Sequence, residues 1–306
     1  MLALLLSALV VGAAPAASPS LALEPSTVRP GDVLLVRVTG ATSAPGGAVA
    51  GRTLRFWRAG EEEWRALAAL PIETTPGTMT VRVEAGVALA ADLTVVEPGF
   101  THHAITVDRR FVEPPPRVKR RIEADRKAFA RAFAQPFSPP LFQGSFDWPR
   151  RAPTSGRYGD QRVLNGKAAS VHYGLDITGP RGSPVAASND GEVVVARDAY
   201  FSGKTVVVWH GADLFTVYFH LDRIAVRQGQ RLRKGAVVGA LGSTGRATGP
   251  HLHWGAKVGG LYVDPESLLG IDFAGGTAPA RRAGAPEPVE PPEPEEPAAS
   301  PASTSE

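Results

Sequence analysis

The chain has 306 residues, enough for about two domains with hydrophobic cores of their own. Its 43% hydrophobic and 21% charged residues are typical of a soluble globular protein. It contains no cysteine, which excludes disulfides, thiolate metal ligands, a catalytic thiol and a lipid-modified cysteine.

The net charge of +3 is unevenly distributed along the chain. Residues 281–306 contain two arginines and six glutamates, a balance of −4, so residues 1–280 carry +7 with histidine neutral. The positive charge of residues 1–280 favours binding to an anionic polymer such as a cell wall or a nucleic acid. No helix combines basic and aromatic residues in a pattern that suggests base recognition, so we expect no nucleic-acid partner.

The N-terminus begins with a short apolar run that ends in small residues, from residue 2 to residue 17. It predicts a secretory signal peptide over residues 1–17, although the usual lysine or arginine before the run is missing. The alternative is an uncleaved membrane anchor, but the run is short and rich in alanine for a membrane span. We therefore expect an exported protein with no transmembrane segment after signal cleavage.

A first β-rich segment covers residues 21–98. Met79, Val81 and Val83 alternate with polar residues, which is the period of a strand with one buried face. Turn signals such as Pro76-Gly77 separate the apolar runs. Several short strands at this spacing predict a small β-sandwich of immunoglobulin-like type. We find no catalytic group in it and expect it to position, dock or occlude another part of the protein.

Residues 99–155 are predicted to form a linker with one helix, residues 117–134. Prolines introduce the helix, and Phe129 and Phe133 lie on its apolar face while lysines and arginines cover much of the remainder. A basic amphipathic helix can lie on a membrane surface. We favour a connector that packs its apolar stripe on a neighbouring domain, followed by a long ordered loop from Gln135.

A second β-rich region follows, and we assign it to residues 156–272. Glycines punctuate its strands, which we expect near Gly191–Arg197, Thr205–His210, Leu214–His220, Val237–Leu241 and His251–Val258. Residues 273–306 are mostly proline, glutamate, alanine and serine with little to bury, which predicts a disordered tail.

The strand predicted from His251 carries two histidines two residues apart. Side chains alternate along a strand, so His251 and His253 point to one side while Leu252 points into the core. Pro250 fits as the first residue of such a strand. The two imidazoles can serve one metal, or one can bind metal while the other moves protons. The alternative is a pair of polar residues on the wet face of a sheet.

Two other clusters lie in the same region. In His172-Tyr-Gly-Leu-Asp176 the neighbouring glycines argue against a helix, so we expect this pair where a strand meets a turn. His220 ends an apolar strand. Two imidazoles and a carboxylate form a ligand set that zinc accepts, with the fourth tetrahedral position open for water in a catalytic site. Histidines that are not on the metal can transfer protons.

The region from about Gly156 to Leu269 resembles the lysostaphin-type zinc endopeptidases of peptidoglycan. In chain order, the matching motifs are His172-x-Gly-x-Asp176, Gly182-Ser-Pro-Val185, Asp190-Gly-Glu-Val193, His210-Gly211, Thr216-Val-Tyr-Phe-His-Leu221, Gly229, Lys234-Gly235, Gly242 to His253 and Asp264-Pro265. The series is far more specific than any single motif. The family often has a glutamate soon after the last histidine, where this chain has Trp254-Gly-Ala.

The resemblance implies a fold and a set of site residues. The C-terminal domain is then a small antiparallel β-sheet metallopeptidase domain, and the protein is mainly all-β with a sandwich and a linker helix before it. His172, Asp176 and His253 are implied as the ligands of one Zn²⁺ per chain. His220 and His251 are implied as catalytic histidines. The same resemblance makes His210 a turn residue rather than a ligand.

The resemblance also implies a zinc-dependent endopeptidase that hydrolyses peptide cross-links of bacterial peptidoglycan by attack of a zinc-bound water. The partner is then peptidoglycan, and the protein is periplasmic or secreted and associated with the cell wall. The alternative is a catalytically inactive relative that binds the wall or activates another hydrolase. The bond cut stays open between a D-Ala–diaminopimelate cross-link, an oligoglycine bridge and another peptide. Whether the N-terminal domain or the linker inhibits the site also stays open.

Overall fold

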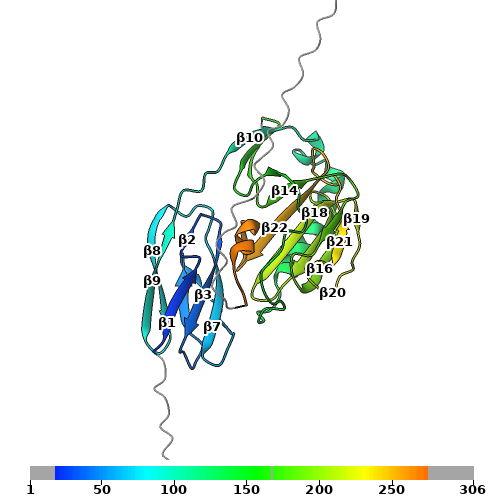
Figure 1. Cartoon of the computed structure of the whole chain (residues 1–306). Coiled ribbons are helices and arrows are strands. Elements are labelled where there is room, and N and C mark those ends of the chain that lie inside the picture. The colour runs from blue at the N-terminus through cyan, green and yellow to red at the C-terminus, as the bar shows by residue number, and fades with distance from the viewer. Residues whose placement is uncertain (1–17, 167, 275–306) are drawn as a thin grey trace, which may run out of the picture.

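The computed structural model describes residues 18–166 and 168–274. The predicted signal peptide and almost all of the predicted tail lie outside these residues. The described part is mainly β with one α-helix, as expected from the sequence. No helix in it is long and apolar enough to span a bilayer. In Figure 1 an N-terminal sandwich stands beside a larger C-terminal sheet, and strand β22 lies on the side of that sheet nearer the sandwich.

The N-terminal part is the predicted β-sandwich. One sheet contains, in order, β1 (Ser20–Glu24), β3 (Val33–Thr39), β7 (Glu63–Ala69) and β6 (Trp57–Arg58). The other contains β2 (Thr27–Val28), β9 (Ala88–Val95), β8 (Gly77–Glu84), β4 (Gly46–Val49) and β5 (Arg52–Thr53). Leu34, Val36 and Leu93 are fully buried between the two sheets. The alternation seen in the sequence corresponds to this core.

Strand β3 is buried on both faces, which explains its continuous apolar run. Leu34 and Val36 face the sandwich core. Val33 and Leu35 point the other way and pack with Leu214 and other apolar residues of the C-terminal domain. A strand covered on both sides has no wet face to mark with polar residues. The sandwich and the C-terminal domain therefore share a hydrophobic interface.

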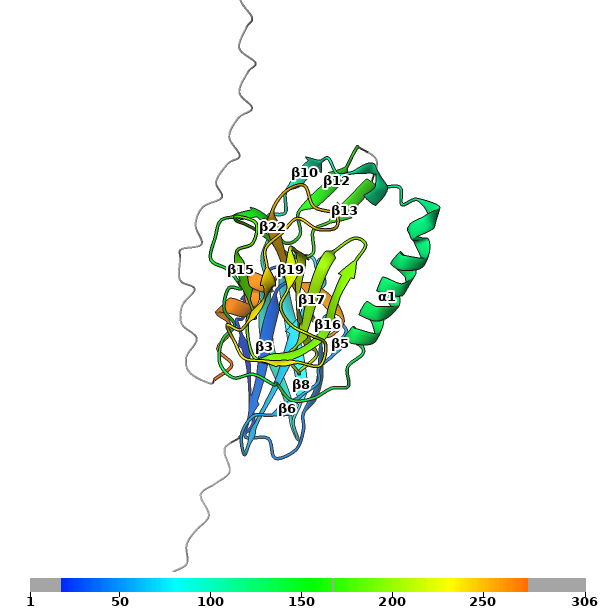
Figure 2. The ribbon, with the colours of Figure 1, turned by 90° about the vertical axis from the view of Figure 1, so that its right-hand side faces the viewer.

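The connector contains two 3-10 turns, Arg109–Phe111 and Pro116–Val118, and then helix α1 (Lys119–Phe133). The helix starts just after the prolines and ends before Gln135, close to the predicted bounds. Phe133 packs edge-on against Phe215 of the C-terminal sheet, with ring centroids 5.2 Å apart. Buried Asp125 accepts a hydrogen bond from the backbone N–H of Tyr200 at 2.8 Å. Figure 2 shows α1 alongside β16, so the helix packs on the neighbouring domain as expected.

The C-terminal domain is built on one large sheet. Its path runs β11 (Thr154–Gly156), β14 (Leu175–Thr178), β22 (His251–Val258), β18 (Leu214–Leu221), β17 (Gly203–Trp209), β16 (Gly191–Ala199) and β20 (Arg231–Leu232), with β23 (Leu261–Val263) also paired to β22. Two three-stranded sheets flank it: β10 (His102–Ile105), β12 (Gln161–Leu164) and β13 (Ala168–Val171); and β15 (Pro184–Ala186), β21 (Val237–Ala240) and β19 (Arg223–Ile224). A final 3-10 segment covers Pro265–Gly270. The domain boundaries proposed from the sequence stay predictions.

Three adjacent antiparallel strands position the candidate site. β22 lies between β14 and β18, and its register places Asp176 of β14 opposite His253 and Phe219 of β18 on the other side of His253. Directly opposed residues of antiparallel strands share a face and lie within contact distance. Leu252 points to the other face and is fully buried in the core. The alternation predicted for this strand is confirmed.

Substitution of Leu35 on β3 tests the hydrophobic interface between the sandwich and the C-terminal domain. Leu35 is completely buried against the C-terminal domain. Leu35→Ala leaves a cavity there and should lower the free energy of unfolding by about 2–5 kcal/mol in urea titrations. Val87→Ala is the control, because Val87 is 50% exposed, and should change stability by less than about 0.5 kcal/mol. Equal effects of the two substitutions would contradict the buried interface.

Candidate metal centre

Three donor atoms from distant parts of the chain converge on one point. His172 Nε2 lies 3.0 Å from Asp176 Oδ1 and 2.9 Å from His253 Nδ1, and the latter two atoms are 3.0 Å apart. A tetrahedral ion with bonds of about 2.0–2.2 Å places its ligand atoms about 3.3–3.6 Å apart. This triangle therefore has nearly the size of one face of such a site. Within the described residues, no other group of three His, Asp or Glu side chains has this convergence.

The hydrogen bond of the His172 ring to the backbone leaves its other nitrogen free to bind a metal cation at the centre of the triangle. Its Nδ1 lies 2.8 Å from the carbonyl oxygen of Arg157. A carbonyl can only accept, so Nδ1 carries the proton and Nε2 of the neutral ring presents a lone pair. That lone pair faces the carboxylate oxygen of Asp176 and a ring nitrogen of His253. Lone pairs at this distance repel one another unless a proton or a metal cation lies between them, so the three donor atoms fit a metal ion.

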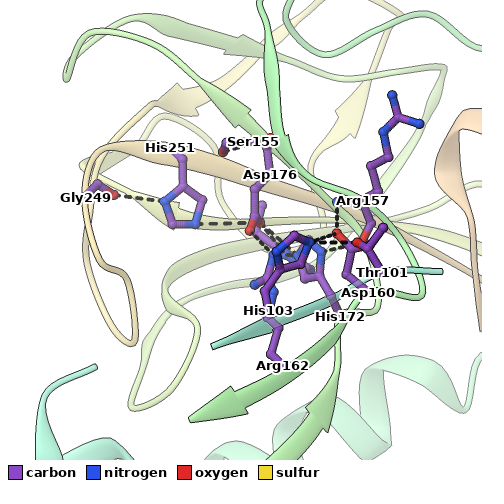
Figure 3. A network of polar contacts seen from close by, with 11 residues as sticks. Thr101, His103, Ser155, Arg157, Asp160, Arg162, His172, Asp176, Gly249 and His251 are labelled. Carbon is purple, nitrogen blue, oxygen red and sulfur yellow. Dashed lines mark hydrogen bonds and ion pairs between the residues drawn. The ribbon is translucent and has the colours of Figure 1, made fainter. Parts of the chain in front are cut away.

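A tight turn holds the carbonyl that orients His172. The backbone N–H of Arg157 donates to Asp160 Oδ2 at 2.8 Å, and the backbone N–H of His172 donates to the Asp160 carbonyl at 2.9 Å. Thr101 Oγ1 donates to the other carboxylate oxygen of Asp160 at 2.6 Å. Figure 3 shows this turn beside the imidazole of His172 and the carboxylate of Asp176. Such outer partners fix the orientation of a metal-binding imidazole.

The protonation states of the other two donors also suit a metal. Burial lowers the pKa of His253 to about 4, so its imidazole is neutral near pH 7. Burial opposes ionisation of Asp176, but the close approach of the His172 and His253 imidazoles outweighs burial and holds the pKa of the carboxyl well below its usual range. A neutral imidazole and an ionised carboxylate are the forms that bind metal ions.

His220 reaches the same face through an irregular backbone. Strict alternation along β18 would send its side chain into the core with Tyr218. Its φ is +61°, an uncommon conformation that a non-glycine residue adopts at strained or functional positions. The His220 ring lies 4.9 Å from the His251 ring and 6.2 Å from the His253 ring, between centroids. The break in alternation thus brings His220 to the metal-site face.

His220 and His251 are each oriented by a hydrogen bond from the ring to a backbone carbonyl. Nδ1 of His220 donates to the carbonyl of Thr244 at 2.7 Å, and Nδ1 of His251 donates to the carbonyl of Gly249 at 2.9 Å. Each ring therefore carries its unprotonated nitrogen at Nε2. His251 Nε2 lies 3.7 Å from Asp176 Oδ1. Burial and the neighbouring histidines lower the pKa of His220 to about 3, so this ring is a neutral proton acceptor at pH 7.

Arg162 is a site residue that the sequence did not reveal. Its Nη2 donates to the second carboxylate oxygen of Asp176 at 2.7 Å. A Cβ on Gly156 would lie only 2.3 Å from this Nη2 and 2.9 Å from Asp176 Oδ2, so the contact requires glycine there. Arg162 comes from a different, three-stranded sheet, and no short motif connects it with Asp176. The carbonyls of Arg157, Thr244 and Gly249 have no sequence signal at all.

The remaining expectations concern residues away from the metal triangle. His210 lies at the turn after β17, as expected, and is fully buried; its ring nitrogens contact the Asp190 carbonyl at 2.6 Å and Thr216 Oγ1 at 2.8 Å. Trp254, which follows the last histidine, is also fully buried and packs against Trp148. Neither residue points to the histidine face.

A comparison of the chain with protein-family models matches residues 170–265 to Peptidase family M23. These residues include His172, Asp176 and His253 of the triangle, together with His220 and His251. Residues 170–265 form a Peptidase family M23 domain. This is a family of metallopeptidases, which agrees with the resemblance stated from the motifs.

Two curated relatives share the M23 domain region. The chain is 44% identical over 98 residues to the peptidoglycan DD-endopeptidase ShyA of Vibrio cholerae, covering 32% of this chain and 23% of ShyA. It is 41% identical over 98 residues to the DD-carboxypeptidase/endopeptidase Mpg of Neisseria meningitidis, with the same two shares. The chain thus spans about a quarter of the length of the curated relatives that it matches.

One solved structure is similar over most of the chain. A Pseudomonas aeruginosa protein assigned to peptidase M23 superposes with a TM-score of 0.58 and 29% identity, covering 80% of this chain and 95% of that protein. The similarity extends beyond the M23 domain, since residues 170–265 make up less than a third of the chain.

The triangle makes a direct prediction for metal content. We expect purified protein to hold about one metal ion per chain after dialysis, measured by mass spectrometry of the dissolved metal. His253→Ala removes one of three ligands and should reduce the bound metal to near zero. His102→Ala is the matched control, because His102 is exposed on β10 and lies outside the triangle. Full metal retention by His253→Ala would exclude this ligand set.

His210 provides a pH test that is independent of the metal. Burial lowers its pKa from 6.5 to about 4, so between these values the unfolded chain takes up a proton that the folded chain does not. Stability should therefore fall as pH falls from 6.5 to 4. From pH 7 to pH 4.5, wild type should lose about 2 kcal/mol more unfolding free energy than His210→Asn, whose side chain does not titrate. Urea titrations at both pH values measure this, and parallel losses would contradict it.

Proposed function

We propose that the protein is a zinc-dependent endopeptidase that hydrolyses peptide cross-links of bacterial peptidoglycan. The observation that supports this most strongly is the triangle of His172, Asp176 and His253 with two further histidines beside it. Two imidazole nitrogens and a carboxylate oxygen are a donor set typical of catalytic zinc. The names of ShyA and Mpg supply the substrate and the reaction of those relatives.

A divalent ion in this site supplies Lewis acidity, which lowers the pKa of a water molecule and polarises a carbonyl. The protein's own residues then handle protons. His220 and His251 each present an unprotonated Nε2, so either ring can accept a proton from water and return it to the leaving amine. Arg162 holds the outer oxygen of Asp176, which leaves the inner oxygen as the ligand. The ring nitrogens bonded to Thr244 and Gly249 keep both bases in the correct orientation.

The proposed substrate also implies a place for the protein. Peptidoglycan lies outside the cytoplasmic membrane, so the enzyme would work there, periplasmic or secreted. The signal peptide predicted from residues 1–17 would provide the export route. The N-terminal sandwich contacts the C-terminal domain through β3, on the face of β22 opposite the histidines. We therefore propose that the sandwich supports the site and does not cover it through this contact.

The division of roles between His251 and His253 is testable. His251→Ala should keep the bound metal, because His251 Nε2 lies 3.7 Å from the ligand oxygen of Asp176. It should reduce kcat by about 10²–10⁴ through loss of a proton-transfer group. The assay is conversion of cross-linked muropeptides to monomers in purified peptidoglycan, with metal content measured on the same sample.

His102→Ala should match wild type in both measurements. Cleavage by His251→Ala at the wild-type rate would contradict the role given to this histidine. A wild-type protein that holds one metal ion but cleaves no peptidoglycan would favour the alternative, an inactive relative that binds the wall or activates another hydrolase.

A further inference from the structure

The loop between β21 and β22, residues 241–250, accepts a hydrogen bond from each of the two proposed proton-transfer histidines. The carbonyl of Thr244 accepts the hydrogen bond from His220, and the carbonyl of Gly249 accepts the one from His251. Arg246 lies between these two carbonyls along the chain. Its backbone N–H donates to the carbonyl of Phe201 at 2.8 Å. Arg246 is therefore held in the segment that orients both histidines.

The guanidinium of Arg246 has no acidic partner among the described residues. It lies 5.8 Å from the centre of the Phe201 ring, and its side chain is half-buried. Burial and the positive charge of Arg162 both lower its pKa, so the two guanidinium groups are close enough to repel each other. Two other arginines of this domain do have acidic partners: Arg197 pairs with Asp125 at 2.7 Å, and Arg181 pairs with Asp222.

Arg162 also has hydrogen-bonding capacity to spare. It uses Nη2 for Asp176, and its side chain remains 19% exposed. A guanidinium has five N–H donors in a planar fork that matches a carboxylate. Two like charges held together in a partly buried place are unfavourable without an anion nearby. Asp176 offsets Arg162 only in part, because its other oxygen belongs to the metal triangle.

We propose that Arg246, assisted by the free N–H groups of Arg162, binds a carboxylate of the substrate beside the scissile amide. The carboxylate must be close to the reacting bond, since Arg162 contacts a proposed metal ligand and the loop of Arg246 holds both proton-transfer histidines. The inference rests on the proposed endopeptidase function and specifies its substrate. Arg246 acts as a specificity residue that positions the peptide.

The chemistry selects one class of cross-link. In an amide whose nitrogen comes from the D-centre of diaminopimelate, the carbon that bears the nitrogen also bears a carboxylate. An interior bond of an oligoglycine bridge has no such group. The arginine pair therefore favours cross-links with a free carboxylate on the carbon next to the scissile nitrogen. Amidation of that carboxylate removes its charge and should weaken binding.

Two synthetic cross-linked peptides test the preference for a carboxylate. They are identical except that the carbon next to the scissile nitrogen bears a free carboxylate in one and a primary amide in the other. Wild type should show a kcat/KM about 10- to 100-fold higher for the carboxylate peptide, the range expected for a charged hydrogen bond. Arg246→Gln should lose this preference, mainly through a higher KM, and Arg246→Lys should recover part of it. Arg82→Gln is the control for charge, since Arg82 is exposed on β8 of the sandwich, and should retain the full preference.

Binding to non-hydrolysing protein separates this inference from the proposed function. By calorimetry, His251→Ala should bind the carboxylate peptide more tightly than the amide peptide, and His251→Ala with Arg246→Gln should bind both alike. If wild type cleaves neither peptide but this binding difference is seen, the endopeptidase function fails and the carboxylate site stands. If the double variant retains the difference, or if His251→Ala binds both peptides equally, the carboxylate site is wrong.

Discussion

The structure depends on the close approach of three electron-rich atoms, one from each of three distant residues. His172 Nε2, Asp176 Oδ1 and His253 Nδ1 lie about 3 Å from one another. One hydrogen bond, from His172 Nδ1 to the carbonyl of Arg157, directs the lone pair of His172 Nε2 inward. Without a proton or a metal cation between these atoms, this geometry would be unfavourable. The protein enforces it with rigid elements: the pairing of β14 with β22 and the turn that ends at Asp160.

The two faces of the large sheet serve different purposes. On one face, β22 presents His251 and His253, with helix α1 nearby: Phe129 of the helix contacts Phe219, which stacks on His253 with ring centroids 5.1 Å apart. On the other face, Ala256 and Val258 pack with β3 of the sandwich. The sandwich thus buttresses the strand that carries the histidines, while the connector helix shares their side of the sheet.

Local patterns predicted much of the fold and the identity of the clustered residues. The bounds of β22 agree with the prediction because alternation, Pro250 and the flanking glycines are all local signals. The double burial of β3 was not predicted, since Leu35 is covered by a domain distant in sequence. Arg162 and the carbonyls of Thr244 and Gly249 escaped detection for the same reason. The side chain of His220 would point away from the site if its strand were regular. Its backbone conformation, which breaks the alternation, turns the side chain toward the site. The metal and proton-transfer roles stay proposals derived from the resemblance and the geometry.

X-ray diffraction at the zinc absorption edge, on crystals grown with equimolar zinc, tests the central claim most directly. The account predicts one anomalous peak per chain, about 2.0–2.2 Å from His172 Nε2, Asp176 Oδ1 and His253 Nδ1, with His220 and His251 outside bonding distance. A peak bound by other residues, or zinc-loaded crystals in which these three side chains remain uncoordinated, would contradict it.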